Sequence, residues 1–192
     1  AILVARPLRE IYPSLYLQNL KGHVMRTSSY EEFLDEQSAR DRRPEHFQRG
    51  QVFHYQYLEE QLNKACCDVH WLRYSSTHLL QDLLKTIFKH GSLEHPLDGL
   101  KEPPKPEGLN PRRSLDGAVV SLAREVNRLC REGVVVAKER QELLAMLLDV
   151  SDRVRQGRQE LDAFRMNYAN DLDALDDELN GSFWCRLAGD AS

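Results

Sequence analysis

The stretch LLAMLLDV, Leu143–Val150, consists mostly of large apolar residues, although 29% of the chain's 192 residues are charged. Such a segment buries its side chains, because exposing them to water costs free energy in proportion to their apolar area. It is much shorter than the ~20 apolar residues that a helix needs to cross a bilayer. Two surfaces remain that could cover it: the protein's own core and another protein.

Apolar residues on both sides of this stretch recur at alternating steps of four and three, the spacing of a helix that packs along one seam. Ser114 is a good N-cap residue, and the pair Asn180–Gly181 is a typical C-terminal stop. The pattern therefore predicts a long coiled-coil helix over residues 114–180. Its weak point is EGVVVA, Glu132–Ala137, where glycine and β-branched residues lower helix propensity, so a kink or break is expected there.

A second heptad pattern predicts another long helix over residues 44–90, with Pro44 in its first turn. Most of the prolines lie in the following segment, which predicts a Pro-rich linker over residues 91–113. The first segment, 1–43, is irregular apart from one short helix expected from Tyr30 to Arg42, preceded by a capping-box pattern that starts at Ser29. Residues 181–192 form a C-terminal tail.

These segments predict an all-α protein, an elongated coiled-coil helical hairpin or bundle with long helices and an irregular N-terminal segment. The spacing assigns Leu143, Leu147 and Val150 to the seam, and Leu144, Met146 and Leu148 to a widened apolar face. A widened face indicates contact with at least one more helix, from the chain itself or from a partner. Arg140 falls at a core position, where a charge is costly unless its head reaches water or a carboxylate.

A hairpin around the linker leaves the end of the longer helix without a facing helix, although that end keeps an apolar stripe. We expect a partner protein, through a heteromeric coiled coil, to cover the stripe; the N-terminal segment is the alternative cover. The residues expected to bind partners are Leu144, Leu148, Leu161, Phe164, Tyr168, Leu172, Leu175, Leu179, Phe183 and Trp184. The acidic run DLDALDDEL, Asp171–Leu179, lies at a helix C-terminus, where negative charge is unfavourable, and this favours a basic partner surface.

The sequence carries no motif for catalysis. It has no glycine-rich phosphate loop, no C-x-x-C metal spacing and no Glu-x-x-His pair in the two predicted long helices, so we expect no catalytic, cofactor or metal residues. A net charge of -4 provides no basic field for nucleic acid, and no apolar run is long enough to span a membrane. Four cysteines, two of them adjacent at Cys66 and Cys67, are expected to be reduced, which indicates a cytoplasmic or nuclear location.

The resulting hypothesis is a non-catalytic coiled-coil subunit or scaffold of an intracellular multiprotein assembly, for which cytoskeletal complexes are a fold-level analogy. Such a subunit would bind partner proteins through exposed apolar helix stripes. The alternative is a membrane-associated helical module that tethers or remodels membranes. That module would need a basic face, which the negative net charge disfavours.

Overall fold

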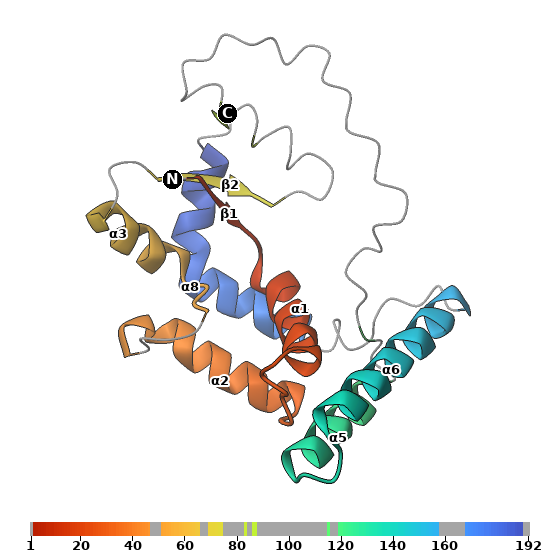
Figure 1. Cartoon of the computed structure of the whole chain (residues 1–192). Coiled ribbons are helices and arrows are strands. Elements are labelled where there is room, and N and C mark those ends of the chain that lie inside the picture. The colour runs from red at the N-terminus through yellow and green to blue at the C-terminus, as the bar shows by residue number, and fades with distance from the viewer. Residues whose placement is uncertain are drawn as a thin grey trace. The chain divides into compact units, whose positions relative to one another are not determined.

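The computed structural model describes residues 2–46, 51–65, 69–74, 83, 86, 87, 115, 119–157 and 168–189. Helices predominate among these residues, which confirms the helical class (Figure 1). The chain divides into two compact units. Unit 1 comprises Ala1–Arg6, His54–Pro111 and Asn180–Ser192, and unit 2 comprises Pro7–Phe53 and Arg112–Leu179. None of the helices in the described ranges is both long enough and apolar enough to cross a membrane.

Unit 2 is a set of helices packed around α1. Its elements are α1 (Leu8–Lys21), α2 (Tyr30–Arg42), the 3-10 helix η1 (Pro44–His46), α5 (Val120–Arg131), α6 (Ala137–Gly157) and the first half of α8 (Ala169–Gly189). The core residues of α1 recur every four positions, at Leu8, Tyr12, Tyr16 and Leu20. Burial of this stripe offsets the cost of Pro13 inside the helix, which removes a backbone donor.

Unit 1 combines α3 (Tyr55–Ala65), the second half of α8 and two parallel strands, β1 (Ile2–Ala5) and β2 (His70–Arg73). Ile2 pairs with His70 and Ala5 pairs with Arg73. The rings of Tyr55, Trp71, Phe183 and Trp184 form one cluster with centroid distances of 5.0–5.5 Å. This cluster is the aromatic core of the described part of unit 1.

The predicted continuous helix over residues 44–90 is wrong. The described residues in that range include η1, the shorter helix α3 and the strand β2, and they are helical again at Leu83, Thr86 and Ile87. Strand formation at His70–Arg73 depends on backbone pairing with β1, which lies far away in the sequence. The spacing of apolar residues in one segment does not reveal a distant strand with which it pairs, because strand preference is set largely by the packing context.

The predicted helix over residues 114–180 is interrupted where a break was expected. Helix α5 ends at Arg131 and α6 begins at Ala137. Between them Gly133 has a φ of 76°, a conformation that only glycine adopts readily. Helices α5 and α6 pack against each other, so the hairpin turns at Gly133. The linker predicted at residues 91–113 lies outside the described residues.

Helix α8 continues through the predicted stop at Asn180–Gly181 and ends at Gly189. The buried Asn180 side chain accepts the backbone N–H of Tyr55, at 2.7 Å, and so caps the start of α3. Glycine inside a helix costs about 1 kcal/mol, and burial of the Phe183 side chain, two residues later, contributes about 2 kcal/mol. The tail predicted from residue 181 therefore begins as helix.

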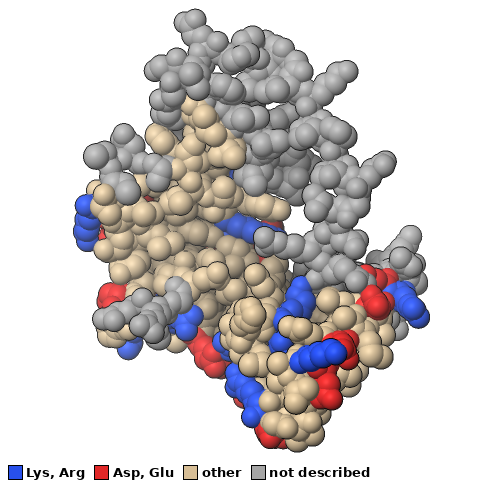
Figure 2. All heavy atoms as spheres, in the orientation of Figure 1, with Lys and Arg blue, Asp and Glu red and all other residues tan. Residues whose placement is uncertain are grey.

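Several charged side chains of the α5–α6 hairpin form ion pairs on the surface. Figure 2 shows basic and acidic side chains next to one another over these helices. Arg128 contacts Glu125 and Glu132, each at 2.5 Å, and these bonds raise the pKa of Arg128 and lower that of Glu125. Because all three groups are exposed, the pairs add little stability.

A candidate protein-binding groove between α2 and α8

Both ends of α1 are capped by side chains from distant parts of unit 2. Pro7, at the N-cap, has no side-chain acceptor, and Asp176 of α8 accepts the Leu8 N–H at 3.1 Å. At the other end, the Arg140 guanidinium donates to the carbonyls of Leu20 and Gly22 at 3.1 and 2.9 Å. A carboxylate at the positive end and a guanidinium at the negative end both complement the helix dipole. This arrangement fixes α1 against α6 and α8.

The packing of α2 on α1 is organised by the buried carboxylate of Asp41. It accepts hydrogen bonds from the Tyr12 hydroxyl, from Gln37 Nε2 at 3.2 Å and from the Phe53 backbone N–H at 2.9 Å. Burial raises the pKa of Asp41, and the three bonds oppose that rise. Burial also raises the pKa of Tyr12, so its hydroxyl remains protonated. The network fixes the Tyr12 ring in position between α2 and α8.

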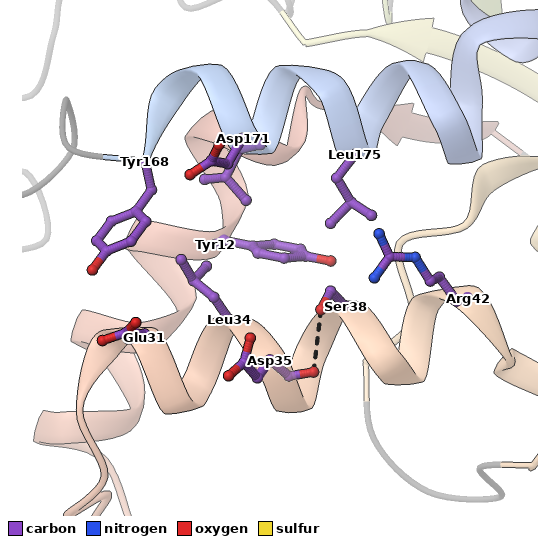
Figure 3. A pocket seen from close by; sticks show the side chains of 10 residues that line it. Tyr12, Glu31, Leu34, Asp35, Ser38, Arg42, Tyr168, Asp171 and Leu175 are labelled. Carbon is purple, nitrogen blue, oxygen red and sulfur yellow. Dashed lines mark hydrogen bonds between the residues drawn. The ribbon is translucent and has the colours of Figure 1, made fainter.

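A groove of about 280 Å³ opens beside this ring (Figure 3). Helix α2 forms one wall, α8 forms the other, and the Tyr12 ring crosses between them. The apolar lining consists of Tyr12, Leu34, Tyr168, Leu172 and Leu175, and the polar lining consists of Glu31, Asp35, Ser38, Arg42 and Asp171. The groove therefore has an apolar floor and a rim rich in carboxylates.

The rim carries an excess of negative charge. Glu31, Asp35 and Asp171 are exposed and have no ion-pair partner among the described residues. The single cation in the described lining, Arg42, donates from Nε and Nη2 to the two carboxylate oxygens of Glu178, both at 2.9 Å. This pairing raises the pKa of Arg42 and lowers that of Glu178. The groove consequently offers an apolar surface bordered by three carboxylates that have no cationic partner among the described residues.

Three of the residues predicted to bind partners, Tyr168, Leu172 and Leu175, line this groove. The expected exposure of the α8 stripe is nevertheless wrong, because Leu172, Leu175 and Leu179 are at most 8% exposed. Residues of α1 and α2 share one core cluster with them, and the rings of Tyr30 and Tyr168, one turn before Leu172, have centroids 5.4 Å apart. The N-terminal segment, which was the alternative cover, is therefore the one observed.

The acidic run of α8 also finds basic partners in its own chain. Arg9 pairs with Asp173 at 3.3 Å, and Arg42 pairs with Glu178 at 2.9 Å. Asp171, at the start of the run, is the carboxylate that faces the groove (Figure 3). The basic surface that the sequence led us to expect is thus supplied in large part by α1 and α2.

The remaining predicted residues lie elsewhere. Phe183 is buried and Trp184 half-buried in the aromatic cluster of unit 1, where Arg73 lies 5.6 Å from the centroid of the Trp184 ring. Leu144 and Leu148 of α6 line a second groove, of about 270 Å³, together with Lys21 and His23. Leu161 and Phe164 lie outside the described residues.

The α2 side of the groove lies outside the residues predicted to bind partners. The α2 side chains Glu31, Asp35 and Arg42 belong to no motif. The capping box at Ser29 and Glu32 correctly located the helix that carries them, with bonds of 2.6 and 3.1 Å. Nothing in the local sequence indicated that α2 faces α8, because this depends on packing between segments more than 120 residues apart.

The groove combines an apolar floor with an acidic rim. Its floor can cover an apolar side chain, and its rim can pair with Lys or Arg. In the part of the chain that the structure describes, no three His, Cys, Asp or Glu side chains are grouped to hold a metal. No protein-family model matches this chain, and comparisons with curated proteins and with solved structures find no significantly similar protein.

Proposed function

We propose that this protein is a non-catalytic binding subunit whose α2–α8 groove captures a segment of another protein. The observation that carries the proposal is the apolar floor beneath three carboxylates, Glu31, Asp35 and Asp171, that lack a cationic partner among the described residues. The fitting segment has a large apolar residue for the floor and a Lys or Arg within one turn of it. The acidic run of α8 contributes Asp171 to this rim, and Glu31 and Asp35 come from α2.

The size of the groove favours a side-chain anchor over a small-molecule site. Its volume of about 280 Å³ is at the lower limit of the ~300–1,000 Å³ typical of small-molecule pockets. Binding through one or two anchors surrounded by charge gives modest affinity and strong specificity for charge. Such contacts suit a subunit that holds partners within a larger assembly, and we propose that this subunit works within a cytoplasmic or nuclear assembly. Cys130 and Cys185 support that location as free thiols.

The first prediction concerns charge reversal at the rim. The probes are two labelled amphipathic helical peptides with the same leucine stripe, one bordered by lysine and the other by glutamate. The lysine peptide should bind the wild-type chain, and the double variant Asp35→Lys/Asp171→Lys should bind it about tenfold or more weakly, because both rim attractions become repulsions. Fluorescence anisotropy at two salt concentrations measures the effect, which should shrink as salt screens the charges.

The matched control is Asp177→Lys, which makes the same kind of charge change at an exposed position of α8 that does not line the groove. It should leave the affinity for the lysine peptide within about twofold, since a distant exposed charge is screened. Equal binding of the glutamate peptide, or an equal loss in the control variant, would show that the groove does not select its ligand by rim charge.

A further inference from the structure

We propose that the outer face of α6 pairs with the same face of a second copy of this chain, in an antiparallel homodimer. The proposal rests on a second surface of unit 2, separate from the α2–α8 groove. Leu143 is 36% exposed, Met146 63% and Val150 44%. These three residues are spaced by three and four positions, so they lie on one face of the helix.

A neighbouring face of α6 packs inside unit 2. Arg140, Leu144 and Ser151 are buried, and the bonds of Arg140 to the end of α1 fix the rotation of α6 about its axis. The sequence assigned Leu143 and Val150 to the buried seam, but the structure exposes them and buries Leu144. The hydrogen bonds of Arg140 explain this difference, because they determine which face of α6 is buried. The spacing of apolar residues does not reveal such bonds.

The exposed stripe continues to a charged residue at each end. Glu139 precedes Leu143 by four positions, and Arg153 follows Val150 by three, so both share the face of the apolar residues. Both are exposed, and Glu139 also accepts the Val136 N–H at 3.0 Å. The stripe therefore has a negative end, an apolar centre at Met146 and a positive end.

This order of charges is self-complementary under a two-fold axis. Glu139 lies seven residues before Met146, and Arg153 lies seven residues after it. An antiparallel copy centred on Met146 places each Glu139 opposite an Arg153 of its partner and covers both apolar centres at once. A parallel copy would place like charges together. Isologous pairing of one patch with itself is the usual geometry of homodimers, and the charges select its antiparallel form.

The dimer is expected to be weak. A single helix face buries less than the ~1,200–2,000 Å² of standard stable interfaces, so monomer and dimer should exchange reversibly. Its value to a binding subunit is that two α2–α8 grooves would be joined in one particle, which strengthens attachment to any target that carries two copies of the ligand segment. The existence of the dimer does not depend on the function of the groove.

The second prediction is a charge-exchange experiment by sedimentation velocity on the full chain, over a concentration series that reaches the millimolar range. The wild type should show a reversible monomer–dimer equilibrium. Arg153→Glu alone and Glu139→Arg alone should each weaken self-association about tenfold or more, because two attractions become two repulsions. An equimolar mixture of these two variants should restore the dimer, since every cross-pair again joins opposite charges.

Two control variants distinguish this interface from nonspecific self-association and from any effect of the α2–α8 groove. Lys64→Glu makes the same charge change as Arg153→Glu at an exposed position of α3, outside α6, and should leave self-association unchanged. Asp35→Lys/Asp171→Lys should also leave it unchanged, whatever its effect on peptide binding. A wild type that stays monomeric throughout the series would overturn the proposal, and so would a mixture of the two variants that fails to dimerise.

Discussion

Replacing Arg140 with methionine should lower the free energy of unfolding by about 3 kcal/mol, because it removes the charged member of a buried hydrogen-bond network. The guanidinium donates to Asn127 Oδ1 at 2.8 Å, to the Leu20 carbonyl at 3.1 Å and to the Gly22 carbonyl at 2.9 Å. Methionine retains much of the apolar stem but leaves the Gly22 carbonyl and the Asn127 amide oxygen without this donor. Urea unfolding followed by circular dichroism measures the loss.

A large effect is expected because, among the described residues, the buried Arg140 guanidinium donates its hydrogen bonds to backbone carbonyls and an amide oxygen and to no carboxylate. Burial accordingly lowers the pKa of Arg140, and the negative end of the α1 dipole favours its charged form. Asn127 supports the same site by donating to the carbonyls of Leu20 and Arg26, at 2.9 and 2.8 Å. The network joins α1, α5 and α6, so its loss should be felt throughout unit 2.

Two further variants test the geometry of this site. Arg140→Lys keeps the charge but cannot form the same fork of bonds, so its loss should lie between zero and that of Arg140→Met. Lys138→Met, at an exposed position of the same helix, should change stability by no more than about 0.5 kcal/mol. If Arg140→Met costs no more than Lys138→Met, the network does not hold α6 in place.

Features of the fold that depend on neighbouring residues could be predicted from the sequence. The capping box at Ser29 starts α2, and its two reciprocal bonds are local. Gly133 breaks the long helical pattern because a positive φ there needs no partner elsewhere. The helical class follows from the spacing of apolar residues over most of the chain.

Features that depend on distant partners could not be predicted in the same way. Strand β2 needs β1, and the buried face of α6 is set by Arg140 and the end of α1. The apolar stripe of α8 was correctly recognised, but the chain's own α1 and α2 cover it, and only part of it remains at the floor of a groove. The spacing of apolar residues therefore identified which helix faces are apolar. It did not indicate which of these faces are buried within the chain itself.

Asp41→Leu should lower the free energy of unfolding by about 3–4 kcal/mol, because three donors lose one buried acceptor group. The Tyr12 hydroxyl, Gln37 Nε2 and the Phe53 N–H all converge on the two carboxylate oxygens. Asp41→Asn is the matched variant, since its amide oxygen can accept the bonds from Gln37 and Phe53 while its amide group donates to the Tyr12 oxygen. It should cost much less than Asp41→Leu, and thermal unfolding of both variants measures the difference.

The pH dependence of the stability of the wild type and of Asp41→Asn gives an independent test of how burial affects the Asp41 carboxyl group. Burial raises the folded-state pKa of Asp41 above its unfolded value, so the folded state binds more protons in the interval between the two. Asp41 therefore favours the fold most at pH values below its unfolded pKa, and this contribution is lost as the pH rises through the folded pKa. The stability of the wild type relative to Asp41→Asn should fall over that interval and then stay level. A relative stability that instead rises with pH would show that the hydrogen bonds of Tyr12, Gln37 and Phe53 outweigh burial at this carboxylate.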